Sequence, residues 1–247
     1  MEEINIIDIF KDKTLYSNLE QYNQDLIDIG NKYTYKSQDY HHDKTLSSYW
    51  FTPNIDRIRS LPLMRCHPLD DPLVSKNTNY NLLLFVPNYL PLFLINLLYI
   101  DKNICIEDFG CGSAWFSYYL SKCGYNNFSF WDNWYQCNEN IFLDVVKKGN
   151  ISYKLNEMKT NPTVVNNSGS PFTFITYGID GEHDRDLSNL ELVCFETNLN
   201  WKNKYAPIFL PKKGFRYLCE DKDNLSISYC REDKYNNFLE QIKPYAI

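Results

Sequence analysis

The sequence predicts a mixed α/β fold: a mostly parallel, seven-stranded sheet that carries helices on both faces. Two observations lead to this prediction. Short apolar segments that end in acidic residues alternate with helical patterns, most clearly in residues 104–134. Near the end of the chain, residues 215–220 and 225–230 are two apolar segments separated by turn residues, which predicts an antiparallel β-hairpin. We therefore expect one α/β domain at 81–247, preceded by a helical and loop-rich extension at 1–80.

The stretch 104–134 begins with an apolar strand that Asp108 closes, and continues through a turn that contains Gly110 and Gly112. A helix and a second apolar strand follow, and Asp132 closes that strand. In a parallel sheet both strand ends lie at the same edge, where ligands bind. Glycines let the backbone bend sharply there, and the N–H groups that start the helix face the ligand. A carboxylate after the second strand can accept hydrogen bonds from ribose hydroxyls. This order predicts a nucleotide-like ligand.

The residues from Ile106 to Gly112 resemble the first motif of the class I S-adenosylmethionine-dependent methyltransferases, a Rossmann-like family. That motif runs apolar-apolar-Asp-apolar-Gly-x-Gly, and Ala114 stands where many relatives have a third glycine. The resemblance implies S-adenosylmethionine as cofactor, with Asp108 near its methionine end, directly or through water. It implies that the binding residues are Asp108, Phe109, Gly110, Cys111, Gly112 and Ser113 in the turn, Asp132 on the ribose, and Asn133 and Trp134 beside the adenine.

Other readings of the turn remain open. A nicotinamide-dependent oxidoreductase is disfavoured because Trp115 stands where Gly or Ala would allow tight packing of the helix on the sheet. Asp108 would also oppose a pyrophosphate group. The turn could belong to another α/β domain without a ligand, or to a non-catalytic descendant that keeps the fold as a binding or scaffolding module.

Residues 15–29 predict an amphipathic helix that ends at Gly30. We expect this helix to pack against the main domain, although a partner-binding helix is also possible. The apolar residues that recur on one face are Leu15, Leu19, Tyr22, Leu26 and Ile29.

Residues 32–79 lack helical or strand periodicity and predict a loop-rich cap with short helices. The methyltransferase resemblance implies that such an extension covers the cofactor and shapes the acceptor pocket. His41, His42 and Asp43 could be metal ligands or substrate contacts, but adjacent side chains rarely bind one metal without a further partner. We therefore expect surface histidines and no metal site.

Residues 82–100 are apolar over the length of a membrane span. They also contain Pro87, Asn88, Pro91 and Asn96, and they lead directly into the first strand of the sheet. We expect instead a helix that lies on the sheet, with Pro91 near its start.

The rest of the chain predicts further strands, two helices and a loop. A helix at 139–148 stops at Gly149, and the last helix carries Tyr235, Phe238, Leu239 and Ile242 on one face. The expected strands are the third at 151–155, the fourth at 171–179 and the fifth at 190–196, with a loop at 156–170.

Asp180, Glu182 and His183 follow the predicted fourth strand. The resemblance implies that the end of this strand faces the transferred methyl group, so these residues are the candidate catalytic groups. They could orient an acceptor hydroxyl or take its proton, and His183 has the intrinsic pKa best suited to a base. The alternative is a solvated turn in which an aspartate caps a short helix.

The C-terminal part is similar to the FkbM-type methyltransferases, which act on sugar hydroxyls. The pieces that carry this similarity are Asp180-Gly181-Glu182, Phe195-Glu196 and Gly214-Phe215, with the Glu-Gly order of the family inverted. The implied function is O-methylation of a small-molecule or glycan hydroxyl.

The composition limits which partners and which cellular compartment we expect. The net charge of -6 lacks the broad basic excess of a nucleic-acid wrapper, so the composition gives no strong nucleic-acid signal, although a local basic patch is possible. The eight cysteines contain no C-x-x-C spacing, which argues against zinc and for free thiols in a reducing compartment. The acidic N-terminus lacks the basic region of a secretory signal. We expect a cytoplasmic protein; the oligomeric state is not predicted.

Overall fold

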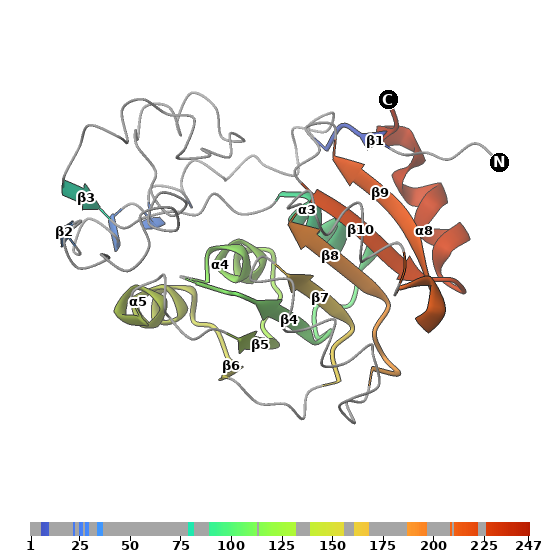
Figure 1. The fold of residues 1–247 in the computed structure, drawn as a ribbon. Coiled ribbons are helices and arrows are strands. Elements are labelled where there is room, and N and C mark those ends of the chain that lie inside the picture. Colours follow the sequence, from blue (N-terminus) through green and yellow to red (C-terminus); the bar gives the residue numbers. More distant parts are fainter. Residues whose placement is uncertain are drawn as a thin grey trace.

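A computed structural model describes residues 6–9, 22, 25–26, 28–29, 34–36, 79–81, 89–112, 114–131, 139–155, 161–167, 187–196, 208, 210–221 and 226–247. Its centre is an eight-stranded sheet with the strand order β1-β9-β10-β8-β7-β4-β5-β6 (Figure 1). The strand bounds are β1 (Ile6–Ile7), β4 (Ile106–Phe109), β5 (Phe128–Trp131), β6 (Tyr153–Leu155), β7 (Val164–Asn167), β8 (Leu192–Glu196), β9 (Phe215–Asp221) and β10 (Ser226–Arg231).

The sheet is parallel except for β10, which runs antiparallel between β8 and β9. From the central strand β4 the chain moves outward through β5 to β6, and then returns to β7 on the other side of β4. The strand order therefore reverses between β4 and β7, which is the position where open α/β sheets bind ligands. Five parallel strands followed by a terminal hairpin form the class I methyltransferase sheet, as predicted, and β1 adds an edge strand parallel to β9.

Two hydrophobic cores cover the two faces of the sheet, because successive strand residues point to opposite sides. The larger core holds Ile106, Phe130 and Val164 together with residues of all the described α-helices. The smaller core holds Val165 and Phe195 of the other face. The helix bounds are α3 (Tyr89–Leu98), α4 (Trp115–Lys122), α5 (Glu139–Gly149) and α8 (Tyr235–Ile242), with short turns η7 (Pro211–Lys213) and η8 (Lys243–Tyr245).

The apolar segment before the first strand is a helix that lies within the larger core. Helix α3 has 10 residues, Pro91 is its third, and all of its residues except Asn96 and Leu97 are buried. At 1.5 Å per residue it is about 15 Å long, half the thickness of a bilayer core. Among the residues that the structure describes, no helix has the length and apolar character of a membrane span.

The predicted helix at 139–148 is confirmed with a small correction at its end. Gly149 is the last helical residue rather than the residue beyond it, and Asn150 takes the left-handed conformation with φ of 51°. Asparagine tolerates this conformation better than most residues, which makes it a suitable helix terminator.

The predicted loop at 156–170 is wrong for residues 164–167, which form a strand of the sheet. Strand β7 lies between β4 and β8 and consists of Val164–Asn167, inside the segment expected to be a loop. Two valines flanked by polar residues are too short a pattern to predict a strand, and hydrogen bonding to strands on both sides is what stabilises it. The expected strand at 171–179 lies outside the described residues.

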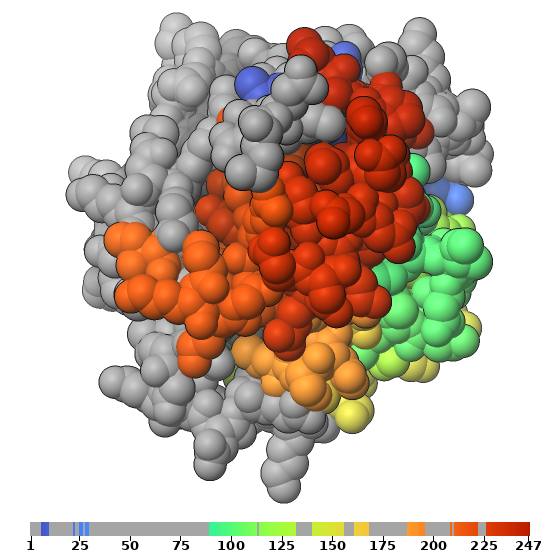
Figure 2. Space-filling view, turned by 90° about the vertical axis from the view of Figure 1, so that its right-hand side faces the viewer, coloured from blue at the N-terminus to red at the C-terminus, as the bar shows by residue number. Residues whose placement is uncertain are grey.

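The N-terminal residues pack on the main sheet. Strand β1 pairs with β9, and the N–H of Asp8 donates to the carbonyl of Tyr245 at 2.9 Å, so β1 lies beside the C-terminal residues (Figure 1). Figure 2 shows the neighbouring face, on which the C-terminal helix and hairpin lie together (red and orange).

The predicted N-terminal helix is present where it is described. Tyr22, Leu26 and Ile29 are helical; Leu26 and Ile29 are buried, and Tyr22 packs on Tyr118 of α4. The expected packing face is therefore used within the chain. Strands β2 (Thr34–Lys36) and β3 (Asn79–Asn81) form a separate antiparallel pair. His41, His42 and Asp43 lie outside the described residues, and the domain boundary at residue 80 stays a prediction.

Candidate functional site

The turn after β4 has three residues in the left-handed region. The φ angles are 74° at Gly110, 51° at Gly112 and 57° at Ala114. The N–H groups of Gly110 and Cys111 both donate to the carbonyl of Trp131, at 2.8 and 3.2 Å, which ties the turn to the end of β5. Glycine adopts positive φ without steric penalty, whereas the left-handed conformation costs alanine about 1–2 kcal/mol. The position where many methyltransferases carry a third glycine therefore still has that backbone conformation here.

Helix α4 starts directly from this turn. Its first backbone hydrogen bond joins the N–H of Tyr118 to the carbonyl of Ala114 at 2.9 Å. The amide groups of the preceding helical residues, from Trp115, head the helix at the edge where β4, β5 and β7 end. We call this edge the turn edge. Amides at a helix start carry partial positive charge and favour an anionic group.

Asp108 is 1% exposed and braces three elements. Its Oδ1 accepts a hydrogen bond from Asn166 Nδ2 at 2.9 Å, and its Oδ2 accepts one from Ser117 Oγ at 3.3 Å. These bonds link β4 to β7 and to α4. The Asp108 carboxylate is therefore held within the sheet–helix interface, and Asn166 lies beside it on the adjacent strand. The predicted contact between Asp108 and the methionine end of a cofactor stays a prediction.

The opposite face of the sheet presents a different row at the turn edge. In the strand register, Phe109 lies between Trp131 of β5 and Asn167 of β7. The Phe109 and Trp131 rings stack, with centroids 5.7 Å apart and an interplanar angle of 21°. One row deeper, the side chains of Glu107 and Ser129 are buried. A central strand that is buried on both faces is normally apolar, so this polar content is unusual.

Several polar atoms in this region are shielded from solvent without a hydrogen-bond partner among the described residues. They include both amide atoms of Asn167, the Nε1 of Trp131 and the Oγ of Ser129 on this face, and the Oδ1 of Asn166 on the face of Asp108. An unsatisfied buried polar atom costs about 1–3 kcal/mol. Native proteins keep few of them, so this group is a candidate binding site, although Tyr99 and Glu220 elsewhere in the sheet region also have such an atom.

The sequence prediction missed Asn166 and Asn167 because it assigned their segment to a loop. Two valines followed by two polar residues are a shorter form of the pattern that identified Asp108, and this form is too short to predict a strand. The structure brings Asn166 to Asp108 and Asn167 to Phe109, as neighbours across β4 and β7.

The remaining predicted site residues lie outside the described residues. These residues are Ser113, Asp132, Asn133, Trp134, Asp180, Glu182 and His183. Asp132 directly follows Trp131, the last residue of β5, so the strand that it was expected to close ends where predicted. The roles of all these residues stay predictions.

Of the described cysteines, Cys111, Cys194, Cys219 and Cys230 are buried in the core, Cys105 is partly buried and Cys123 is exposed. Burial raises the pKa of the Cys194 thiol, and raises those of Cys219 and Cys230 to about 12. Such thiols are protonated and unreactive at neutral pH. Within the described ranges, no three His, Cys, Asp or Glu side chains are grouped so that they could hold a metal ion.

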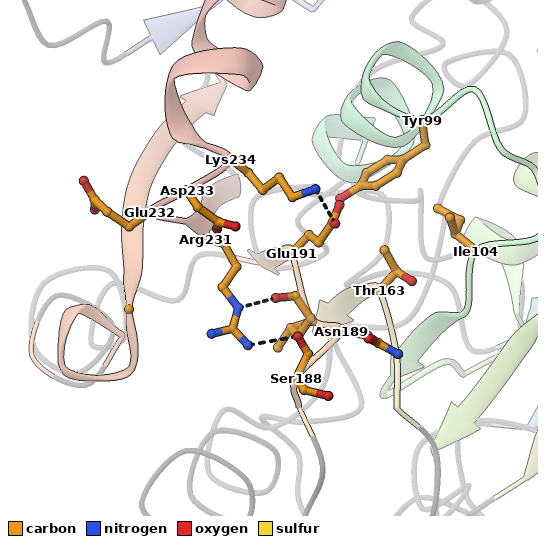
Figure 3. Close-up of a pocket in the computed structure, with 12 residues that line it drawn as sticks. Tyr99, Ile104, Thr163, Ser188, Asn189, Glu191, Arg231, Glu232, Asp233 and Lys234 are labelled. Atoms are coloured by element: carbon orange, nitrogen blue, oxygen red, sulfur yellow. Dashed lines mark hydrogen bonds and ion pairs between the residues drawn. The ribbon is translucent and has the colours of Figure 1, made fainter.

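A cavity of about 780 Å³ lies at the other edge of the sheet, where β4, β7 and β8 begin and β10 ends (Figure 3). We call this edge the opposite edge. The charged side chains of its lining are largely paired. Lys234 Nζ lies 2.7 Å from Glu191 Oε1, and Figure 3 shows Tyr99 directed toward the same carboxylate. Arg231 donates from Nε to the carbonyl of Leu190 at 2.8 Å and from Nη2 to that of Leu187 at 2.7 Å.

No protein-family model matches this chain, and a comparison with curated proteins also yields no match. Solved structures do show similarity. One is precorrin-6y C5,15-methyltransferase from Geobacter metallireducens, with 19% identity, 56% of this chain and 86% of that chain covered, and a TM-score of 0.42. Another is TrmK of M. capricolum in complex with S-adenosyl-homocysteine, with 17% identity, coverage of 60% and 70%, and a TM-score of 0.39.

A third similar structure is a tRNA (uracil-54, C5)-methyltransferase of Pyrococcus abyssi in complex with S-adenosyl-L-homocysteine. It has 14% identity and a TM-score of 0.34, with 53% of this chain and 34% of that chain covered. These are distant likenesses of fold. The strand order of this chain, with the antiparallel β10 between β8 and β9, is the order predicted for a class I methyltransferase sheet.

Proposed function

We propose that this protein is an S-adenosylmethionine-dependent methyltransferase that methylates a hydroxyl group of a small molecule or glycan. The observation that carries the proposal is the turn between β4 and α4. Its three left-handed residues, Gly110, Gly112 and Ala114, shape the backbone at the point where the strand order reverses. The resemblance of this turn to the first methyltransferase motif supports the same assignment.

The residues of this edge fit the proposed cofactor. The backbone of Gly110 and Gly112 has no side chain to keep a ligand away, and the amide groups at the start of α4 suit the carboxylate of a methionine moiety. Asp108 places a buried carboxylate near this edge, which suits a cationic ligand better than a pyrophosphate. Asp132 is proposed to hold the ribose, with Asn133 and Trp134 beside the adenine.

When bound, S-adenosylmethionine supplies a methyl group on a positively charged sulfur. The residues of this protein would bind and align the acceptor and exclude water. Positioning alone can supply much of the rate enhancement. Asp180, Glu182 and His183 are the proposed acceptor-side residues. One of them would orient the acceptor hydroxyl, and His183 would accept its proton.

The acceptor is proposed to be small rather than a long nucleic acid. The net charge of -6 lacks the basic excess that a nucleic-acid backbone requires. Nucleic-acid binding can be tested directly, by titrating the protein with tRNA at low and at moderate salt.

The first test is isothermal titration of the purified protein with S-adenosylmethionine, S-adenosylhomocysteine and a nicotinamide cofactor. Micromolar binding of the first two, without the third, is the expected result. Asp132→Ala should weaken the binding of both by about 1–3 kcal/mol, which is about 5- to 150-fold in Kd, because ribose hydrogen bonds are lost. Asp233→Ala, an exposed acid at the opposite edge, is the matched control and should leave the Kd unchanged. Unchanged affinity in Asp132→Ala would remove the ribose assignment.

A second candidate function is a non-catalytic, methyltransferase-like binding or scaffold protein. The connection between β6 and β7 favours it: residues 156–163 are fewer than the dozen or so that a helical crossover between parallel strands requires. This shortened connection departs from the usual crossover between parallel strands. Cofactor binding without methyl transfer to any of a panel of hydroxyl compounds would favour the second function.

A further inference from the structure

The cavity at the opposite edge is lined by polar and charged side chains that the proposed methyl transfer does not use. Its volume of about 780 Å³ lies within the range of small-molecule sites. Figure 3 shows Tyr99, Glu191 and Lys234 gathered at one side of it. The cavity lies at the other end of the strands from the glycine turn, so a ligand here would be separate from the cofactor and its acceptor.

The two cationic side chains of the lining are already engaged within the protein. Arg231 donates to the carbonyls of Leu187 and Leu190, and its guanidinium lies over the Phe215 ring, 5.0 Å from the centroid. Lys234 Nζ lies 2.7 Å from Glu191 Oε1. Neither cation is therefore left to attract an anionic ligand.

The acidic side chains of the lining outnumber these cations. They are Glu191, Glu232 and Asp233. Asp233 is exposed, and its carboxylate makes no ion pair or hydrogen bond with any residue that the structure describes. The pKa of Lys234 is raised, first by its hydrogen bond to Glu191 and then by the charges of Glu191 and Asp233, although partial burial opposes this. The cavity therefore favours an ammonium group.

The position of this ammonium group is incompletely bonded in the free protein. Tyr99 is 7% exposed, and Figure 3 shows its hydroxyl directed toward the Glu191 carboxylate. The hydroxyl has no hydrogen-bond partner among the described residues, because the Lys234 ammonium bonds Glu191 and does not bond Tyr99. Glu191 also has acceptor positions to spare, since a carboxylate has about four and Lys234 uses one.

A ligand ammonium can complete these bonds where the Lys234 ammonium does not. Lys234 is tethered at the start of α8, whereas a ligand ammonium can place its three N–H donors on the Glu191 carboxylate and the Tyr99 oxygen together. The Lys234 side chain is 39% exposed and has a flexible stem, so its tip can move to solvent when a ligand takes its place. This movement exposes the Tyr99 hydroxyl, which is shielded in the free protein.

We propose that this cavity binds a small aliphatic diamine. One ammonium group of the diamine replaces that of Lys234 between Glu191 and Tyr99, and the other binds Asp233 at the rim. The methylene chain lies against Ile104, a partly buried apolar residue of the lining. This site is independent of the proposed methyltransferase function.

The test is a calorimetric titration with three probes that share a four-carbon chain: putrescine with two ammonium groups, 1,4-butanediol with two hydroxyls, and succinate with two carboxylates. We expect putrescine to bind at least about tenfold more tightly than the other two, because two ion pairs form. Tighter binding of succinate would indicate an anion site, and equal binding of 1,4-butanediol a site for neutral hydroxyls. Either result, or no binding of putrescine, would overturn the proposal.

S-adenosylhomocysteine separates this site from the proposed function. The Kd for putrescine should be the same with and without saturating S-adenosylhomocysteine, and it should be the same if the protein binds no S-adenosylhomocysteine at all. Putrescine binding that S-adenosylhomocysteine abolishes would assign the diamine to the cofactor site and overturn the proposal.

Two variants are expected to act in opposite directions. Asp233→Asn removes the rim carboxylate and should weaken putrescine binding about fivefold or more. Lys234→Met removes the competing ammonium and should strengthen putrescine binding about threefold to tenfold. Glu240→Gln and Lys243→Met make the same charge changes at exposed residues outside the lining, and they should alter the Kd less than about twofold. Unchanged affinity in Asp233→Asn, or weaker binding in Lys234→Met, would contradict the proposal.

Tyr99→Phe tests the deep end of the site. The substitution removes one of the two groups that receive the ammonium, and it should weaken putrescine binding about threefold to tenfold. Tyr153→Phe, at a tyrosine outside the lining, is the matched control and should leave the Kd unchanged. If Lys234→Met does not fold, Asp233→Asn and Tyr99→Phe decide the question, and wild-type affinity in both would overturn the proposal.

Discussion

The two edges of the central sheet differ in how far their polar groups are paired with hydrogen-bonding or charged partners. At the opposite edge, Arg231 donates to carbonyls of the segment before β8, and Lys234 pairs with Glu191, the residue that precedes β8. At the turn edge, Asn167 and Trp131 have buried polar atoms without partners among the described residues. Satisfied polar groups stabilise a fold, whereas unsatisfied ones reduce stability and are kept where a ligand completes them. The Tyr99 hydroxyl at the opposite edge also lacks a partner, so the two edges differ in degree: the turn edge has more of the unsatisfied atoms, and the opposite edge has more of the paired charges.

The largest expected effect is at the opposite edge. Arg231→Met should lower the free energy of unfolding by about 2–3 kcal/mol, because the carbonyls of Leu187 and Leu190 lose a charged donor. Urea unfolding measures this loss. Lys243→Met, which removes an exposed pair with Glu240, is the control and should cost less than about 0.5 kcal/mol. If Arg231→Met weakened binding of S-adenosylhomocysteine but not stability, the division between the two edges would be wrong.

The next prediction also concerns the opposite edge, and it tests how the free energy of unfolding depends on pH. Burial raises the pKa of Tyr99 well above its ordinary value of 10.0, and the nearby Glu191 charge adds to this. A raised folded-state pKa means that the stabilisation is fully present below about pH 10 and is lost as pH rises above it. Tyr99 alone should then remove about 1.4 kcal/mol of stability per pH unit.

Tyr99→Phe should make the alkaline decrease in unfolding free energy shallower by that amount between pH 10 and 11.5. Tyr153→Phe, which changes a partly exposed tyrosine on the edge strand β6, is the matched substitution with which the slope is compared. Identical slopes in wild type and Tyr99→Phe would show that Tyr99 ionises in the folded protein.

The smallest expected change in the free energy of unfolding is at the turn edge. Ala114→Gly should raise the free energy of unfolding by up to about 1 kcal/mol, because glycine adopts φ of 57° without strain. Ala246→Gly, at an extended residue with φ of -60°, has no strain to relieve and should be neutral or slightly destabilising. A loss of stability in Ala114→Gly would mean that the methyl group of this buried residue contributes more through packing than its backbone conformation costs.

The local parts of the fold could be predicted from the sequence. The strand that ends at Asp108, the glycine turn, the following helix and the strand β5 depend on contacts between near neighbours in the chain, and the structure confirms them. Helix α8 follows from the periodicity of Tyr235, Phe238 and Ile242, which are all buried.

The position of the fourth strand could not be predicted in the same way. Val164 and Val165 are too few to show a period of two, and β7 is stable because it pairs with β4 and β8. That error placed the predicted fourth strand at 171–179 and concealed Asn166 and Asn167. Strand β7 therefore forms because it pairs with strands that are distant in the sequence, and not because of local strand propensity.

The sequence by itself determined the glycine turn, its flanking strands and the terminal hairpin, because turn chemistry and apolar patterning are local properties. Only the tertiary structure decided that Ile6 and Ile7 form an edge strand on β9, and that Asn166 braces Asp108. It also decided which polar atoms remain unsatisfied. The physical reason is that hydrogen-bond satisfaction and burial belong to pairs of residues far apart in the chain, and no single segment contains that information.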